Sequence, residues 1–565
     1  MNSLLILLIS IGVLIIGYVV YGSWLAKQWG VDARRVTPAH TQSDGMDYMP
    51  AKASVLLGHH FASIAGAGPI NGPIQAAVFG WVPVLLWILI GGIFFGAVQD
   101  FSSLLASIRH KGRSVGVIIE KNIGLKAKRL FLCFAYLTLI LVVAAFASIV
   151  VGTFDGVADD GSRVAANGST ATISLLFILM AIIFGFAVYR RKAPLALSTV
   201  IGVAGIVICI ILGLKFPLYL DSTAWLIIVC VYIAIASVTP VWILLQPRDY
   251  LSSFLLYAMM LAAFAGVIGT HPAMELPAFT GFRGLSGDNA LFPLLFITVA
   301  CGAISGFHSL VGSGTTAKQL DNERDAKVIG YGGMLIECAL AVVALICVGV
   351  LFQDGAMPAG TPTQVFAAGI ATMIQGIAGE ATYDVAYALI ILSVSAFCLT
   401  SLDTATRLAR YMFQEFFLIG GQKKEELRGI KKLCVNPYFA TGITVLIGGW
   451  LAVGGYARIW PLFGSANQLL AALALLAAAA WLGNSGKNNK MFYVPMAFML
   501  IATLSALILT LHKNIQTISA GGFSFGTQGF QILLIVLLIV LALDLTIEGF
   551  KTLRRTDPPA PLPKD

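Results

Sequence analysis

The chain has 565 residues, of which 58% are hydrophobic and only 11% are charged. Soluble globular domains carry about 25% charged residues, so this composition excludes a soluble globular protein and predicts an all-α polytopic membrane protein. The net charge of +9 does not predict a nucleic-acid partner, because the basic residues gather in short loops between apolar segments that face lipid headgroups. The eight cysteines form neither a disulfide framework nor a CxxC metal pattern.

Fifteen apolar segments approach the ~20 residues that a helix needs to cross a bilayer. The first has no Lys or Arg before it and no clear cleavage site, which indicates a retained span and not a signal peptide. A milder apolar piece at 365–377 is predicted to be interfacial or re-entrant. The predicted spans are 4–25, 61–80, 82–101, 129–152, 171–190, 194–214, 224–246, 249–270, 292–316, 329–352, 384–402, 437–455, 457–482, 491–512 and 528–548.

The basic residues test this count. With the N-terminus outside, 31 of the 36 Lys and Arg fall in loops on the inner side. Such a bias is what the positive-inside rule describes, and one missed span would reverse every later loop. The charge pattern therefore predicts a periplasmic N-terminus and a cytoplasmic C-terminus.

One apolar segment contains an unusual density of helix breakers. Within 66–73, Gly66, Gly68 and Gly72 stand beside Pro69 and Pro73. Two prolines four residues apart remove helix donors and clash with the preceding turn, so a continuous helix is not expected. Broken membrane helices often mark the binding site of a transporter.

The break is the predicted substrate site. We expect the helix to restart near Pro73, so that free amides at its positive end face a carboxylate. Asn71 and Gln75 would add side-chain donors. Gly66, Gly68 and Gly72 would allow close approach, and Thr239, beside Pro240 in a second interrupted segment, would face them. Ser305 and Ser309 would lie beside the substrate.

The order of spans predicts two inverted five-helix repeats, at 61–214 and 224–402, each opening with a proline-broken helix. This is a LeuT-like 5+5 core with extra flanking helices. Residues 1–60 would form the first span and a cytoplasmic loop. Residues 403–565 would form a cytoplasmic loop, four additional spans and a disordered tail at 557–563.

The segment 292–316 carries small and polar residues at spacings of three and four, including Ser305, Ser309, Ser313 and Thr316. Such a stripe is either a packing seam or the wall of a cavity. Its hydroxyl groups would bind Na⁺, or serve water and a proton relay.

Ionisable groups inside the predicted spans are few. Glu337 lies deep in 329–352 and His308 in 292–316, and a charged group at that depth indicates function. We therefore expect both to take part in ion coupling. Asp100, Asp384 and Asp403 lie near span ends and are interpreted as lying at headgroup level.

His59 and His60 are weak candidates for metal ligands, because adjacent residues on a helix face different directions. With His308 and Glu337 they would serve an intramembrane metal-dependent enzyme, which is the less favoured alternative. A channel is another alternative, but no repeated filter motif is present. No Walker-type phosphate loop is present to drive transport by ATP.

Five motifs resemble the carbon starvation protein A (CstA) family. They are GHHFASIAGAGPINGP (58–73), VWILLQPRDYLSS (241–253), SGFHSLVGSGTTAKQ (305–319), TSLDTATRLARY (400–411) and FGSANQLLAAL (463–473). The resemblance implies a carrier of the APC superfamily in the bacterial inner membrane, with no catalytic residues and no cofactor. It implies uptake of peptides and of pyruvate during nutrient limitation, the latter with protons. The resemblance does not identify the coupling ion of this chain; we expect protons, with Na⁺ as the alternative.

Overall fold

The computed structural model describes residues 2–45, 47–158, 160–285, 287, 289–418, 427–521 and 528–554. Over these residues the chain is helical, and its only β-type pairings are isolated bridges such as Asn2 with Ala273. The predicted tail at 557–563 lies outside the described residues. The all-α prediction is therefore confirmed for the described chain.

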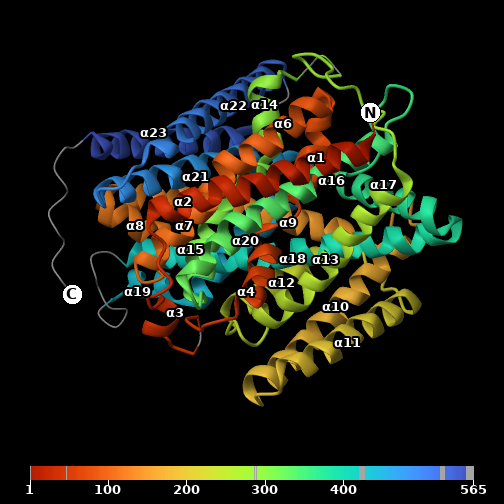
Figure 1. Ribbon diagram of the computed structural model, residues 1–565, viewed down its shortest axis with the longest axis horizontal. Helices are drawn as coiled ribbons and strands as arrows, with labels where there is room; N and C mark the ends of the chain where they lie inside the picture. Colours follow the sequence, from red (N-terminus) through yellow and green to blue (C-terminus); the bar gives the residue numbers. More distant parts are fainter. Residues whose placement is uncertain are drawn as a thin grey trace.

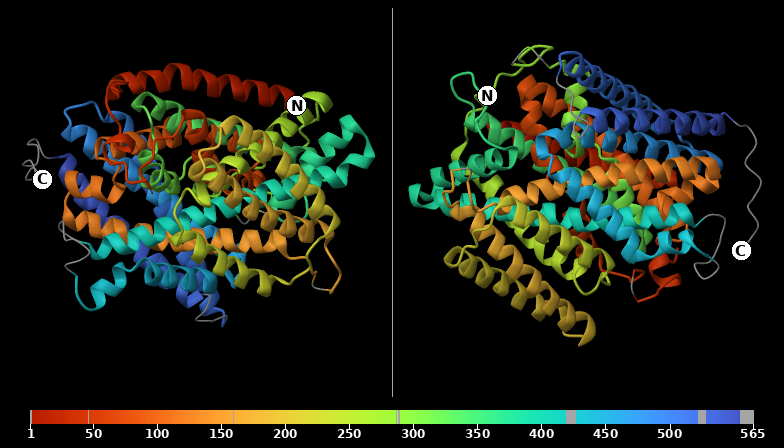
Figure 2. Two further views of the ribbon diagram at one scale, coloured as in Figure 1. Left: turned by 90° about the horizontal axis from the view of Figure 1, so that it is seen from below. Right: turned by 180° about the vertical axis from the view of Figure 1, so that it is seen from behind.

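Most helices run along the long axis of the molecule (Figure 1). The two longest, α9 (Leu125–Phe154) and α18 (Tyr383–Phe417), pack along each other in the centre. The hairpin of α10 (Ala165–Gly185) and α11 (Leu195–Lys215) lies on one flank. The pair α22 (Tyr493–Ser519) and α23 (Phe530–Leu553) lies on the opposite flank (Figure 2).

The other helices fill the space between these flanks. They are α1 (Ser3–Ile16), α2 (Ser23–Trp29), α3 (Pro38–Thr41), α4 (Ala53–Ile64), α5 (Gly68–Ala76), α6 (Trp81–Gly91), α7 (Ala97–Arg109), α8 (Val115–Asn122), α12 (Ser222–Val238), α13 (Leu245–Thr270), α14 (Leu291–Thr298), α15 (Gly306–Gly314), α16 (Gly333–Leu351), α17 (Pro362–Ala378), α19 (Ile430–Val435), α20 (Pro437–Ala452) and α21 (Tyr456–Asn484).

Eleven helices of the described chain are long and apolar enough to cross a membrane. Two further apolar helices, α12 and α20, have 17 and 16 residues. The two remaining predicted spans, 61–80 and 292–316, correspond to helices that are each broken into two halves. Every predicted span thus corresponds to helical structure, while the count of fifteen stays a prediction.

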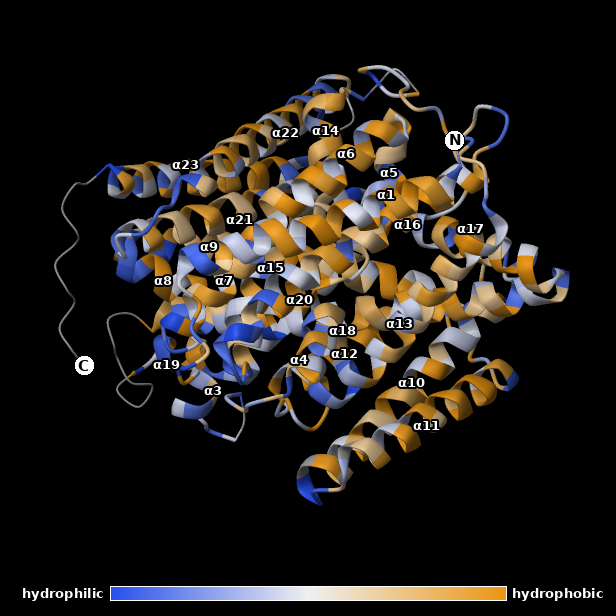
Figure 3. Cartoon of the chain, viewed as in Figure 1, coloured by the Kyte–Doolittle hydropathy of each residue, from blue (hydrophilic) through white to orange (hydrophobic). Residues whose placement is uncertain are grey.

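Hydropathy follows this arrangement. Hydrophobic residues cover outer helices such as α10, α11 and α22, whereas hydrophilic residues gather around α3, α8 and α19 at one end of the bundle (Figure 3). α21 is the exception, because the apolar window of this helix is entirely buried. Helices with apolar outer surfaces suit a lipid environment.

The first discontinuity separates α4 from α5, which together replace one continuous span. Glycines in α5 let it approach the second broken helix backbone to backbone. A side chain at Gly68 would collide with Cys301, and one at Gly72 would collide with the carbonyl groups of Thr298 and Val299. Glycine is required where two backbones come this close.

The second discontinuity separates α14 from α15 and is longer. The freed backbone groups of this segment are paired with side chains from two other helices. Gln99 of α7 donates to the carbonyl of Ser305 at 2.8 Å. The side-chain oxygen of Asn467, in α21, accepts from the backbone amide of Phe307 at 2.8 Å. Such pairing lets irregular backbone exist at membrane depth.

Two details of the predicted break are wrong. The helix restarts at Gly68, with Pro69 in its first turn, and Pro73 lies inside α5. The first turn has free amides, so Pro69 costs no hydrogen bond there. The partner of this break is the segment at the end of α14, because Gly68 and Gly72 lie against it. Thr239 is not the partner: it lies between α12, which ends at Val238, and α13, which begins at Leu245. The interruption at Thr239 is therefore a turn between two helices.

Candidate functional site

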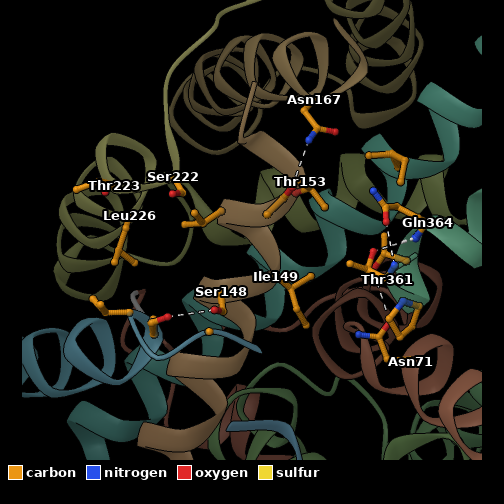
Figure 4. A pocket seen from close by; sticks show the side chains of 18 residues that line it. Asn71, Ser148, Ile149, Thr153, Asn167, Ser222, Thr223, Leu226, Thr361 and Gln364 are labelled. Atoms are coloured by element: carbon orange, nitrogen blue, oxygen red, sulfur yellow. Dashed lines mark hydrogen bonds between the residues drawn. The ribbon is translucent and has the colours of Figure 1, made fainter. Parts of the chain in front are cut away.

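A cavity of about 540 Å³ opens at the end of the bundle where α9 ends and α12 and α17 begin. Asn71 of α5 lies in its wall, where its side-chain oxygen is 3.5 Å from the hydroxyl of Thr363 (Figure 4). Thr153, Asn167 and Ser148 add further polar groups. None of the described lining residues is charged. The volume falls within the range of small-molecule sites, about 300–1,000 Å³.

Of the predicted substrate residues, only Asn71 lines this cavity. The space beside Gly66 is taken by Ser401 and Phe146, just as Cys301 and backbone carbonyls fill the space beside the glycines of α5. Gln75 lies half-buried near the end of α5. The glycines of the first break therefore serve helix packing in this conformation.

Thr239 is also displaced from the predicted site. Its hydroxyl donates to the carbonyl of Ile235 at 2.8 Å, and its own carbonyl accepts from the guanidinium of Arg407. Positive side chains are favourable at the carbonyl end of a helix. Thr239 thus belongs to the end of α12 and does not face the break at Gly66.

Three ionisable side chains meet beside the second break and form what we call the buried triad: Asp100 of α7, His308 of α15 and Glu337 of α16. His308 Nδ1 lies 2.9 Å from Asp100 Oδ2, and His308 Nε2 lies 3.4 Å from Glu337 Oε2. No member exposes more than 2% of its surface. In the described chain, neither oxygen of Glu337 has a hydrogen-bond partner, and neither does His308 Nε2.

The hydroxyl groups of the predicted polar stripe on 292–316 mostly form hydrogen bonds within their own segment. Ser309 donates to the carbonyl of Gly306 at 2.6 Å, and Ser313 donates to the carbonyl of Ser309 at 2.7 Å. The predicted common face is interrupted, because α15 ends at Gly314 and Ser305 precedes it. Ser305 instead pairs with the amide nitrogen of Asn467 at 3.0 Å.

His59 and His60 point to different partners, as predicted. His59 Nδ1 lies 3.0 Å from Asp249, whereas His60 Nδ1 lies 2.8 Å from the hydroxyl of Thr316. Thr316 lies in a short 3₁₀ turn beyond α15. The two histidines therefore do not converge on a common site.

A second group of charged side chains lies toward the end of the bundle opposite the cavity, near the start of α13. We call it the Arg248 cluster. Arg248 pairs with Asp249 at 2.7 Å and with Asp403 of α18. The hydroxyl of Tyr232, in α12, donates to Asp403 at 2.7 Å. His59 connects the cluster to α4 through Asp249.

Asp100 and Asp403 do not face lipid headgroups, because both are buried inside the protein. The helices extend further than the apolar segments that predicted them: α7 continues to Arg109, and α18 to Phe417. Both aspartates therefore lie inside a helix. The contact of Asp100 with His308 spans 208 residues, so no local motif could have predicted it.

Comparisons with known proteins support one class. The sequence matches the family described as Carbon starvation protein CstA over residues 2–357 and 352–506. It is 35% identical to the Peptide transporter CstA of Escherichia coli K12, over 89% of this chain and 80% of that protein. It is 32% identical to the Pyruvate/proton symporter BtsT of the same organism, over 91% of this chain and 82% of that protein.

A solved mutant of the Eremococcus coleocola manganese transporter has the same overall fold. The TM-score is 0.50 at 14% identity, over 90% of this chain and 99% of that chain. At this identity the likeness concerns the fold alone. The apolar helices define a multi-pass membrane protein, and its named relatives are transporters and not enzymes.

Within that class, the sequence matches assign the family. The chain belongs to the carbon starvation protein CstA family.

Proposed function

We propose that this protein is a secondary active transporter that imports small carboxylate-bearing nutrients, peptides or pyruvate, by proton symport. The buried triad is the observation that supports this most. Ionisable groups held fully inside a membrane bundle are costly and mark ion or proton pathways. The relatives named as a peptide transporter and a pyruvate/proton symporter agree with the substrate class.

The charges of the triad fit the uptake of one proton. With both carboxylates ionised and His308 protonated, the triad carries one net negative charge. An unbalanced buried charge costs several kcal/mol, and one further proton removes it. Glu337 is the natural acceptor, because neither of its oxygens has a hydrogen-bond partner in the described chain. Proton binding and release at Glu337 would therefore couple to conformational change.

The cavity at Asn71 is the proposed substrate site. Its amide and hydroxyl groups suit the carboxylate and carbonyl oxygens of a peptide or a keto acid. Its volume admits either substrate. Asn71 lies one helical turn from Gly68, which contacts Cys301 at the second break. Substrate bound at Asn71 would thus act on the segment that holds His308.

We also propose an inverted repeat, with limits that differ from 61–214 and 224–402. One half would begin at α4–α5 and the other at α14–α15. Each broken helix is followed by a long helix, then by a short one (α8 or α17), then by one of the two longest, α9 or α18. The hairpin α10–α11 would be an insertion. Such repeats place the substrate site between them.

The proposed location is the bacterial inner membrane, with a periplasmic N-terminus and a cytoplasmic C-terminus. The cavity would then open to the periplasm. Topology reporters fused to the two termini test this arrangement, and they should report opposite sides. Both termini on one side would rule out fifteen spans.

Uptake by purified protein in liposomes tests the function. A proton gradient, and not a Na⁺ gradient, should drive accumulation of a dipeptide or of pyruvate. The Glu337→Gln variant should keep substrate exchange and lose accumulation, while Glu380→Gln, at an exposed position, should behave like the wild type. Full accumulation by Glu337→Gln would contradict the role of Glu337, and accumulation that follows only Na⁺ would favour the sodium alternative.

A further inference from the structure

Cys301 lies in the second break, beside the buried triad. One ligand atom each from Cys301, His308 and Glu337 lies within 4.8 Å of the other two. All three residues are buried. His308 Nε2 and both oxygens of Glu337 have no hydrogen-bond partner among the described residues. Buried polar atoms without partners, gathered around one point, indicate an incomplete site.

We propose that Cys301, His308 and Glu337 bind a transition-metal ion of the Zn²⁺ type. A thiolate, an imidazole and a carboxylate are a donor set that Zn²⁺ accepts, with the fourth position open to water. Mg²⁺ and Ca²⁺ prefer sites built from oxygen atoms and would bind poorly. This site goes beyond the transport activity proposed above.

The surroundings of His308 are those of a metal ligand. Asp100 holds His308 Nδ1 at 2.9 Å, which leaves Nε2 directed toward Glu337. Metal-bound histidines commonly make this contact with a carboxylate, because it fixes the orientation of the ring. Asn467 lies near the thiol, with its side-chain nitrogen 3.6 Å from Cys301 Sγ.

The charge count allows a divalent ion. A thiolate at Cys301 and a carboxylate at Glu337 offset the two positive charges of Zn²⁺, and Asp100 leaves the site with one net negative charge, the same as that of the metal-free triad. Binding releases to water the thiol proton of Cys301, the Nε2 proton of His308 and any proton held by Glu337, because metal ligands must be deprotonated. The metal and the coupling proton would therefore compete for Glu337, and this consequence rests on the proposed function.

Metal binding to the purified full-length protein tests the site. After treatment with a chelator, the wild type should bind one Zn²⁺ per chain, and excess Mg²⁺ should not displace it. Cys301→Ser should weaken Zn²⁺ binding at least tenfold. Cys338→Ser is the matched control, because Cys338 is another buried thiol, adjacent to Glu337 in sequence, but it packs against Gly92.

Cobalt provides a readout that does not depend on activity. Co²⁺ in the wild type and in Cys338→Ser should give a thiolate-to-metal charge-transfer band, and this band should be absent in Cys301→Ser. If Cys301→Ser does not fold, the Cys301→Ala variant replaces it, and the presence of the thiolate band in the wild type and its absence in Cys301→Ala decide whether Cys301 is a ligand. A wild type that binds no stoichiometric Zn²⁺, or a Cys301→Ser variant that binds Zn²⁺ equally well, overturns the proposal.

Transport assays separate this site from the proposed function. Zn²⁺ should block proton-driven uptake by the wild type and not by Cys301→Ser. If Zn²⁺ binds through Cys301 but uptake needs no proton gradient, the metal site stands and proton symport fails. If uptake is proton-driven and Zn²⁺ does not bind, the metal site fails and symport stands.

Discussion

The two breaks in the bundle differ in what surrounds them. The first, between α4 and α5, is short and lies among glycines that touch neighbouring side chains and, at Gly72, neighbouring backbone. The second, between α14 and α15, is longer, and side chains from α7 and α21 pair with its freed backbone groups. The ionisable triad adjoins the second break.

This difference separates two meanings of an interrupted membrane helix. Gly and Pro in a motif show that the backbone departs from a helix, but they do not show that the departure binds anything. At the first break they allow two helices to approach closely. At the second break the polar partners come from distant helices, and they make it the candidate site. The predictions below test this division, from the largest expected effect to the smallest.

Gly72→Leu should prevent correct folding. The added side chain would meet the carbonyl groups of Thr298 and Val299, and backbone cannot move aside as a flexible side chain does. We expect a loss at or above the upper end of the ~1–3 kcal/mol typical of overpacking. The yield of monodisperse protein and its thermal unfolding measure this. Gly12→Leu is the control, because nothing lies within 4 Å of that position. A stable Gly72→Leu variant would show that the first break has room for a ligand.

Asp100→Asn should impair proton-driven accumulation while the protein stays folded. His308 would lose its charged partner, a contact worth ~1.5–3 kcal/mol, which corresponds to a decrease of about tenfold to a hundredfold. Accumulation in liposomes under a proton gradient measures it. Asp384→Asn, at an exposed position at the start of α18, should have no effect. Equal accumulation by Asp100→Asn and Asp384→Asn would show that Asp100 does not contribute to proton coupling.

Asn467→Ala should destabilise the second break directly. The variant leaves the amide of Phe307 and the hydroxyl of Ser305 without this partner. Leaving buried polar groups unsatisfied costs ~1–3 kcal/mol. Thermal unfolding measures the loss, and the exposed Asn488→Ala variant serves as the control. An unchanged unfolding temperature would mean that the break does not depend on α21.

Ser309→Ala should have the smallest effect. Its hydroxyl bonds to the carbonyl of Gly306 in the same helix, and such a bond adds little to helix stability. We expect a change below ~0.5 kcal/mol in stability and normal proton-driven uptake, with transport kinetics as the measurement. Uptake that depends on Na⁺ and fails in this variant would instead place a sodium site on α15.

The sequence predicted helix positions well, because lipid imposes a simple rule of length and hydropathy. The predicted span 129–152 corresponds to α9, and 249–270 to most of α13. The first break was predicted from its prolines. The second break has no proline between 299 and 305, and the partners of its backbone, Gln99 and Asn467, are remote in sequence. Local patterns could therefore not predict it.

For the site, sequence reasoning identified His308 and Glu337 from depth alone. It missed Asp100 because the helical part of α7 extends beyond its apolar part. It included Asn467, in α21, only within a family motif, although the side chain of Asn467 pairs with the second break. Both errors concern polar residues, Asp100 and Asn467, whose role depends on a contact with another helix.

The Arg248 cluster has a consequence for how the far end of the bundle can open. Its members join α4, α12, α13 and α18 through buried ion pairs and hydrogen bonds. Pulling α13 away from α18 would separate Arg248 from Asp403 and strand both charges in a medium that cannot solvate them. Separation therefore requires water to enter at the same moment. We therefore expect such an opening to be cooperative, because an intermediate in which the ion pair is separated before water arrives would bear the cost of the stranded charges.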